Sequence, residues 1–323
     1  MGEVELGGAG DADVLSVYGE DLGFGCLGHG DRLHRERGRV EAPSVRCTMG
    51  GRGRFDSMNS CLIGHTGFIG GNLARQTAFT DFYNSKNIGE IEGREFGLMV
   101  VSGVTATKWW ANQNAEEDRR RIDSLLGNLS KVKAERVFVI STVDVYPVTR
   151  GVDESFDCHA AANHAYGVNR LYFEDEMKRL FPEARVVRIG GVFGHGLKKN
   201  LIYDLLHDNG VEKINLGSSF QFYDVGGLWN DLVRMEDNDL SLVNLLTEPV
   251  TMGEIVERVF RDAAWGKVVG TEPGPLAAYD VRTKYAEEMG GAGGYLASKA
   301  EVLDGLEAFV AAETAGGVSG GAV

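Results

Sequence analysis

Apolar and polar positions along the middle of the chain alternate between two spacings. Short continuous apolar runs, of the length expected for buried parallel strands, are followed by segments whose apolar residues recur at helical spacing. Such alternation is typical of a parallel sheet covered by helices on both faces, so we expect an α/β fold with a doubly wound sheet. The predicted strands cover residues 60–63, 78–84, 96–102, 136–142 and 184–189, and the predicted helices begin at Gly67, Asn114 and Tyr166.

The helix predicted at Asn114 carries a recognisable start signal. Glu117 follows Asn114 by three residues, which is the spacing of a capping box, and apolar residues continue from Ile122 at helical spacing. We therefore expect the Asn114 side chain to cap this helix.

The composition of the chain argues against several classes of binding partner. A formal net charge of −14 argues against binding to nucleic acid or to an acidic membrane surface, because both are polyanions. The four cysteines show no CxxC and no paired spacing with histidine, so we expect no metal site, and Cys61 is interpreted as a small apolar residue of the first strand. The chain shows neither an apolar run near the roughly 18 residues of a membrane span nor a signal-peptide pattern, which predicts a cytoplasmic protein.

A glycine-rich turn, GHTGFIG at residues 64–70, joins the first predicted strand to the first predicted helix. Gly64 permits a sharp turn, Gly67 lets the backbone approach a pyrophosphate, and Gly70 lets the helix pack close to the sheet. The N–H groups and dipole at the start of the helix attract phosphate. This context predicts a Rossmann-type dinucleotide site, with a tight turn of another α/β fold as the alternative. The expected contacts are Gly64, Thr66, Gly67, Phe68, Ile69 and Gly70.

The identity of the dinucleotide depends on the end of the second predicted strand. NAD sites carry an acidic residue there, about 20 residues after the first glycine, whereas this chain has Asn84, Ser85 and Lys86. Asp81 is expected to lie within the strand. An amide, a hydroxyl and a cation suit a 2′-phosphate, which favours NADP over NAD; a solvated surface role for Lys86 is the alternative.

The glycine turn predicts a division of the chain. We expect residues 58–195 to form the dinucleotide-binding Rossmann core and residues 196–313 to form a smaller, mixed substrate-binding region with strands that return to the core. Residues 1–57 hold 13 of the 45 glycines without a sustained period and are interpreted as a dispensable extension. Residues 314–323 are rich in Gly and Ala and are expected to be disordered.

Three motifs in this order and spacing resemble the extended short-chain dehydrogenase/reductase superfamily: the turn at 64–70, STVDVY at 141–146 and YGVNR at 166–170. The family includes nucleotide-sugar epimerases, dehydratases and reductases, and the resemblance covers about residues 59–310. It implies Tyr166 as the acid/base and Thr142 as its hydroxyl partner, with Ser141 as the alternative. It also implies cofactor contacts from Ser102, Gly103, Tyr166, Arg170 and Gly191, and a possible homodimer.

One position departs from the family motif: Arg170 stands where the family has lysine. Tyr166 and Arg170 lie one helical turn apart, so the cation can stabilise a phenolate, but arginine does not readily relay a proton. Two functions follow. The first is an NAD(P)-dependent enzyme that transfers hydride to or from a nucleotide sugar or a related small carbohydrate. A dehydratase usually has an acidic residue directly after Thr142, whereas Asp144 lies one position further on, so this motif does not identify a dehydratase. The alternative is a non-catalytic NAD(P)-binding sensor or scaffold. A further alternative is that Tyr166 and Arg170 belong to an ordinary amphipathic helix face and have no role in a site.

Two further segments are weaker candidates. The third predicted strand is followed by Lys108, Trp109 and Trp110. The two tryptophans are candidates for stacking on a base or a sugar, with core packing or a subunit contact as the alternatives. The basic turn at residues 196–200 is a candidate for binding the phosphates of a substrate. The equally supported alternative is a solvated turn without a binding role.

Overall fold

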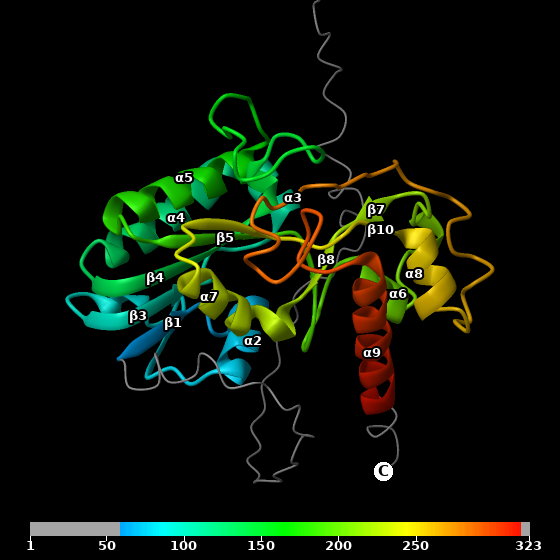
Figure 1. Ribbon diagram of the computed structural model, residues 1–323, viewed down its shortest axis with the longest axis horizontal. Helices are drawn as coiled ribbons and strands as arrows, with labels where there is room; N and C mark the ends of the chain where they lie inside the picture. The colour runs from blue at the N-terminus through cyan, green and yellow to red at the C-terminus, as the bar shows by residue number, and fades with distance from the viewer. Residues whose placement is uncertain (1–58, 318–323) are drawn as a thin grey trace, which may run out of the picture.

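The computed structural model describes residues 59–317, and its centre is a six-stranded parallel sheet (Figure 1). The strand order is β2-β1-β3-β4-β5-β9, so the chain leaves β1 toward one edge and then crosses to the other side from β3 onward. The predicted doubly wound fold is confirmed, and its switch point lies between β1 and β3. The strands are β1 (Ser60–Ile63), β2 (Asp81–Tyr83), β3 (Glu95–Val101), β4 (Lys133–Thr142), β5 (Arg185–Ile189) and β9 (Leu242–Leu245).

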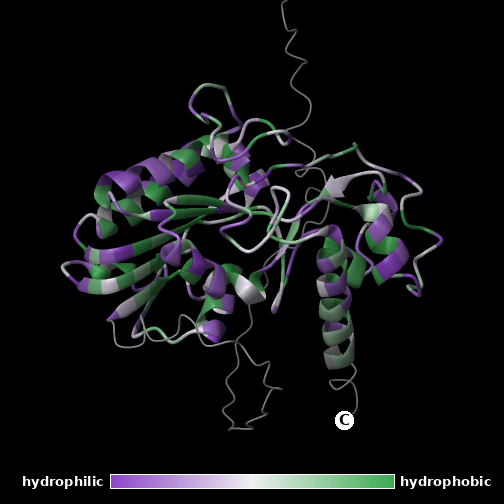
Figure 2. Cartoon of the chain, in the orientation of Figure 1, coloured by the Kyte–Doolittle hydropathy of each residue, from purple (hydrophilic) through white to green (hydrophobic). Residues whose placement is uncertain are grey.

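Helices cover both faces of the sheet because each strand is apolar on both sides (Figure 2). In β1, Cys61 and Ile63 belong to the core beneath α4 and α5, whereas Leu62 belongs to the core beneath α2 and α7. The two-residue period of a strand sends successive side chains to opposite faces. The covering helices are α2 (Phe68–Gln76), α4 (Ala115–Leu129), α5 (Ala165–Leu180) and α7 (Leu228–Asp237), with α3 (Lys108–Gln113) directly before α4.

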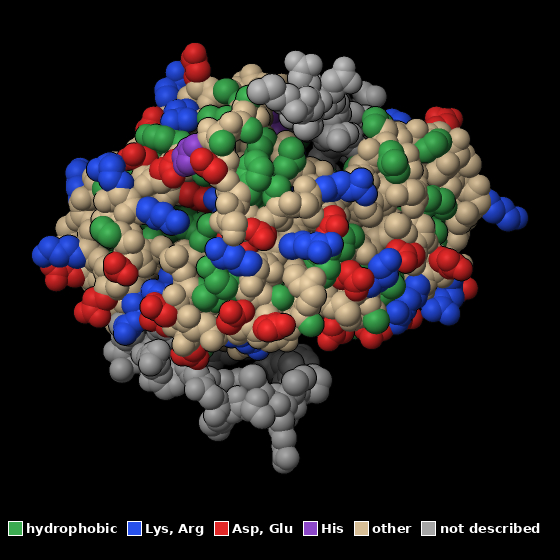
Figure 3. Space-filling model, turned by 45° about the horizontal axis from the view of Figure 1, so that its top comes forward, with side chains coloured by type: hydrophobic (Ala, Val, Ile, Leu, Met, Phe, Trp, Pro, Cys, Tyr) green, Lys and Arg blue, Asp and Glu red, His purple; other side chains and the backbone are tan. Residues whose placement is uncertain are grey.

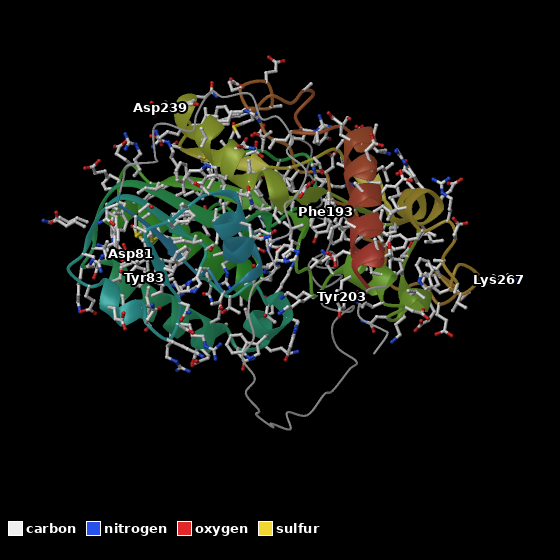
Figure 4. All side chains as sticks on the ribbon, turned by 90° about the horizontal axis from the view of Figure 1, so that it is seen from below. Asp81, Tyr83, Phe193, Tyr203, Asp239 and Lys267 are labelled. Carbon is white, nitrogen blue, oxygen red and sulfur yellow. The ribbon has the colours of Figure 1, made fainter. Side chains whose placement is uncertain are left out.

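The C-terminal part of the chain builds a second apolar core beside the sheet. Phe193 and Leu306 belong to it, and the Phe193 ring lies 5.7 Å from that of Phe309 in α9 (Figure 4). The chain also supplies β9 to the main sheet from this part of the sequence. The region comprises β6 (Gly191–Phe193), α6 (Leu201–Leu206), β7 (Ser219–Phe220), β8 (Phe222–Asp224), β10 (Val250–Thr251), α8 (Met252–Val259) and α9 (Lys299–Gly317).

Short 3-10 helices complete the described chain: η2 (Ile88–Ile91), η3 (Val143–Val145), η4 (Val211–Lys213) and η5 (Val225–Gly227). Acidic and basic side chains are interspersed on the surface shown in Figure 3. None of the helices between residues 59 and 317 is long and apolar enough to cross a membrane.

Three local predictions are wrong. The second strand covers Asp81–Tyr83 alone, not residues 78–84. Asn114 occupies the N-cap position of α4 without a side-chain cap, because its amide donates to the Trp110 carbonyl at the end of α3, 2.9 Å away. Glu117 instead pairs with Arg120 and Arg121, so the capping box does not form.

The predicted C-terminal tail also begins too early. Helix α9 continues to Gly317, and the Thr314 hydroxyl donates to the Val310 carbonyl at 2.8 Å. Ala311, Ala312 and Ala315 favour the helix near this end, whereas Gly316 and Gly317 disfavour its last residues. The predicted extension at 1–57 and the end of the tail at 318–323 lie outside the described residues.

Candidate active site

The glycine turn lies at the switch point of the sheet. Gly64 has a φ of +87°, and a Cβ added to it would lie 2.5 Å from the Ser102 carbonyl oxygen at the end of β3. A Cβ at Gly103 would lie 3.0 Å from an Ile63 methyl group. The ends of β1 and β3 therefore approach so closely that only glycine fits at position 64, which brings the predicted contacts Gly64, Ser102 and Gly103 together.

The start of α2 offers free backbone donors. Gly67 occupies the N-cap position, and among the described residues no side chain caps this helix. A Cβ at Gly70 would lie 2.3 Å from the Gly64 carbonyl oxygen, so glycine lets α2 sit directly on the turn. Thr66 and Gly67 are exposed, whereas Phe68 and Ile69 are half-buried. An exposed, uncapped helix start beside a parallel switch point fits a diphosphate group.

The end of β2 lies next to this turn, because the Gly64 N–H donates to the Tyr83 carbonyl at 2.8 Å. Asn84 closes a local turn, in which its side-chain oxygen accepts the Lys86 N–H at 2.9 Å. The Ser85 and Lys86 side chains are exposed. Asp81 lies within β2 as expected and pairs with Arg94 at 3.0 Å (Figure 4).

Tyr166 is held at the beginning of α5 by interactions that the sequence reading missed. The His164 Nδ1 atom accepts the Gly167 N–H at 3.0 Å, so this histidine caps the helix. The Asn112 side chain accepts the Tyr166 N–H at 2.9 Å, and Asn163 donates to the Asp144 carbonyl at 2.8 Å. These contacts fix Tyr166 against α3 and the turn after β4. The N-cap residue is a histidine, which is not among the residue types that mark helix starts, so the local sequence offered no signal for this cap.

Thr142 and Ser141 face different surroundings because they are consecutive residues of β4. The Thr142 hydroxyl is close enough to the Tyr166 hydroxyl to lower the pKa of Tyr166 slightly. The Ser141 hydroxyl instead donates to Glu174 at 2.5 Å, and Glu174 pairs with Arg188 at 2.7 Å. The structure thus brings Thr142, the predicted hydroxyl partner, next to Tyr166, and places Ser141 in a separate buried network.

Burial dominates the chemistry of the Tyr166 hydroxyl. The side chain is buried, which raises the pKa of Tyr166 to about 12; the positive charge of Arg170 opposes this shift and the negative charge of Asp144 adds to it. Hydrogen bonds from Arg170 and Thr142 lower the pKa by smaller amounts. The expectation that Arg170 makes this phenol acidic is therefore not met. A protonated Tyr166 is suited to donate its proton to an oxygen that becomes negative.

Arg170 is held by α4. Its guanidinium binds the Asp118 carboxylate through two contacts, of 2.8 and 3.1 Å, and also donates to the Thr105 carbonyl. Asn169 donates to the same carboxylate at 2.9 Å. The Arg170 and Asp118 side chains are only 4% and 2% exposed. These donors are therefore engaged within the protein, unlike those of a side chain that reaches for a ribose.

A second ion pair involves Asp144, whose negative charge acts on Tyr166. The Lys108 ammonium at the start of α3 lies 2.9 Å from Asp144 Oδ1, and these side chains are 13% and 17% exposed. The Thr142 hydroxyl lies 3.3 Å from Asp144 Oδ2 and accepts the Asp144 N–H at 3.1 Å. The turn after β4 thus links Thr142 directly to a partly buried ion pair.

The remaining candidates lie around the C-terminal region. Gly191 begins β6 and is exposed, with room for no larger residue because a Cβ there would lie 2.9 Å from the Gln221 carbonyl oxygen. In the basic turn, the Asn200 side chain caps α6 and donates to the Val192 carbonyl at 2.7 Å. Lys199 donates to the Ala106 carbonyl at 3.0 Å, so the turn contacts the loop after β3.

The two tryptophans have different environments. Trp110 lies under the Arg121 guanidinium, whose central carbon is 4.3 Å from the ring centroid. Trp109 is 40% exposed and follows Lys108 at the start of α3. The Trp110 ring is therefore already covered on one face by Arg121, and Trp109 is the more exposed candidate for stacking on a ligand.

Solved structures share this fold. TunA, an NAD-dependent NDP-hexosamine 5,6-dehydratase of tunicamycin biosynthesis, matches with a TM-score of 0.61 and 17% identity over 78% of this chain and 96% of TunA. The UDP-glucose 4-epimerase of Thermotoga maritima, solved with UDP-glucose, matches with a TM-score of 0.58 and 13% identity over 78% and 97%. RMD from Pseudomonas aeruginosa, solved with NADPH, matches with a TM-score of 0.54 and 15% identity over 73% and 93%.

These matches identify the fold as that of NAD(P)-binding α/β proteins with a doubly wound sheet. More particularly, the chain shares its fold with an NAD-dependent NDP-hexosamine dehydratase and a UDP-glucose epimerase, in line with the motif resemblance. No protein-family model matches the sequence, and no curated protein matches it.

Proposed function

We propose that the protein is an NAD(P)-dependent enzyme that transfers hydride to or from a sugar carbon of a nucleotide-linked or related carbohydrate. The observation that carries the proposal is the Tyr166 hydroxyl beside Thr142 at the same sheet edge as the uncapped glycine turn. In open α/β sheets, ligands bind outside the carboxyl ends of the strands. A nucleotide-sugar substrate is suggested by two proteins that share the fold, an NDP-hexosamine dehydratase and a UDP-glucose epimerase.

The residues present fit a dinucleotide. The exposed amides at the start of α2 would hold its diphosphate, and the glycines at 64 and 67 keep two positions of the turn free of side chains. When bound, the nicotinamide supplies or accepts a hydride. Tyr166 would give its proton to, or take it from, the substrate oxygen, while Thr142 would hydrogen-bond that oxygen. A homodimer remains a prediction.

Tyr166→Phe tests the chemistry. We expect kcat for nicotinamide turnover with a panel of nucleotide sugars to fall by about 10²- to 10⁴-fold, while the affinity for NAD(P)H stays the same, because only the proton donor is lost. Absorbance of the reduced nicotinamide reports turnover, and its fluorescence reports binding. Tyr172→Phe is the matched control, since this hydroxyl lies on the same helix and donates to Asp123 outside the site.

The engaged Arg170 favours the second candidate, a dinucleotide-binding sensor without catalysis. Binding of NAD(P)H without turnover of any sugar nucleotide, and with Tyr166→Phe indistinguishable from the unmodified protein, would establish that function instead.

We further propose that the cofactor is NADP. Among the described residues at the end of β2, Asn84, Ser85 and Lys86 place no carboxylate where NAD sites have one, and the Ser85 and Lys86 side chains are exposed. Lys86→Met is expected to weaken NADPH binding roughly tenfold, about 1.4 kcal/mol, and to leave NADH binding unchanged. Fluorescence titrations measure both, with Lys131→Met as the control at another exposed lysine. Equal affinity for NADH and NADPH would contradict the proposal.

A further inference from the structure

The segment between β6 and α6, residues 194–200, is hydrogen-bonded to two elements of the dinucleotide-binding part of the chain and is called the strap below. The Asn72 amide on α2 donates to the His195 carbonyl at 2.9 Å. The Lys199 ammonium donates to the Ala106 carbonyl, in the loop after β3, at 3.0 Å. The strap therefore connects α2 to the loop that follows the third strand.

Both elements that hold the strap border the glycine turn. Helix α2 starts at the turn, with Gly67 at its N-cap position. The loop after β3 starts beside Gly64, because a Cβ added to Gly64 would lie 2.8 Å from the Gly103 Cα atom. A segment that is bound to both elements spans the turn, so a dinucleotide on the exposed amides of α2 would lie next to the strap.

The two contacts of the strap differ in how readily they can break. Asn72 is only 6% exposed, and its amide also donates to the Phe68 carbonyl at 2.9 Å. Separating the strap from Asn72 would leave a buried donor without a partner, which is unfavourable. Lys199 is exposed and carries its ammonium on a flexible chain, so water can replace the Ala106 carbonyl as its acceptor. The Lys199 contact is therefore the one that can open.

The backbone of the strap also provides a hinge. Its φ angles are positive at Gly194 (+150°), Gly196 (+77°) and Asn200 (+133°). A Cβ added to Gly196 would have no described atom within 4 Å, so the backbone angle and not crowding favours glycine there. The Asn200 side chain caps α6 and thereby fixes the far end of the strap. Gly196 lies between the Asn72 contact and Lys199, where rotation meets the least steric resistance.

We propose that the strap closes over bound NADP(H) and that the hydrogen bond from Lys199 to the Ala106 carbonyl holds it closed. Opening of this contact then limits the rate at which the cofactor leaves. The inference rests on the proposed function in that it needs a bound dinucleotide, but it needs no sugar substrate. It gives the basic turn a role other than the binding of substrate phosphates.

The test measures release of NADPH from the full chain. Protein loaded with NADPH is mixed rapidly with excess NADP⁺, and the change in nicotinamide fluorescence gives the release rate. Lys199→Met is expected to speed release about tenfold, because a hydrogen bond from a charged donor is lost only in the closed form. Lys199→Arg keeps a charged donor and should recover most of this difference. Lys198→Met is the matched control, since it removes the same charge from the exposed neighbouring residue and should leave release unchanged.

Gly196→Ala tests the hinge without changing any charge. Alanine disfavours the positive φ of the closed strap, so release should become about threefold faster. Gly93→Ala is its control: Gly93 has a φ of +75°, no described atom lies within 4 Å of its added Cβ, and it precedes β3. Hydrogen exchange gives a second readout. Backbone amides of residues 194–200 should exchange more slowly when NADPH is bound, and this protection should be smaller in Lys199→Met.

Thermal unfolding shows that the compared variants are folded. Unchanged release in Lys199→Met would overturn the proposal, as would an equal acceleration in Lys198→Met, because the charge of the turn and not the contact would then matter. Turnover of a nucleotide sugar with unchanged release in Lys199→Met would reject the strap and retain the enzyme. Faster release in Lys199→Met without turnover of any sugar would support the strap and reject the enzyme. Failure to bind either dinucleotide would overturn both proposals.

Discussion

Replacing Glu174 by Gln is expected to lower the free energy of unfolding by about 3–5 kcal/mol. Glu174 pairs with Arg188 at 2.7 Å, and these side chains are 4% and 5% exposed. Gln keeps the volume but removes the negative charge, so the Arg188 guanidinium is left buried without a counter-charge. Urea unfolding monitored by circular dichroism measures the loss.

Glu176 provides the matched control on the same helix. It pairs with Arg179 at 2.7 Å, but the arginine side chain is 65% exposed, and exposed pairs contribute little. Glu176→Gln should therefore leave the free energy of unfolding nearly unchanged. Replacing both buried partners, as in Glu174→Leu with Arg188→Met, should recover part of the loss because no charge then remains buried. Equal stabilities of the two single Gln variants would contradict the interpretation of this pair.

The central sheet could be predicted from the sequence because its signals are local. Each strand is an apolar run such as Val137–Val139, and both of its faces are buried, so pattern and structure agree. The boundaries were less predictable. Phe79 and Thr80 have strand-forming side chains, yet the chain joins the sheet only from Asp81, where pairing with β1 begins.

The motifs of the site could be predicted from the sequence, but the ion pairs around Tyr166 could not. The glycines at 64 and 70 are required by backbone contacts that the local pattern implies. Asp118, however, lies 52 residues before Arg170, and no local spacing indicates that the two form a buried pair. The link from Lys108 to Asp144 likewise depends on how α3 packs against the turn after β4. Burial, which raises the pKa of Tyr166 most, and the charges of Arg170 and Asp144 near its hydroxyl also arise only from the tertiary fold.

Two neighbouring glycines of α2 should respond in opposite ways to Ala. A Cβ at Gly70 would lie 2.3 Å from the Gly64 carbonyl oxygen, whereas one at Gly71 would lie 3.6 Å from the His65 carbonyl oxygen. Backbone atoms cannot move aside as the end of a side chain can, so Gly70→Ala forces α2 away from the turn. We expect it to cost about 1–3 kcal/mol of stability.

Gly71→Ala meets an ordinary contact and should gain about 0.5–1 kcal/mol, since Ala loses less conformational freedom in a helix. The same displacement in Gly70→Ala would move the amides that are proposed to hold the diphosphate, so NADPH affinity should fall at least about tenfold in that variant only. Urea unfolding and nicotinamide fluorescence measure the two effects separately. Loss of affinity in Gly70→Ala at unchanged stability would show that the helix shifts without strain. Equal affinity in both variants would show that the start of α2 is not where the cofactor binds.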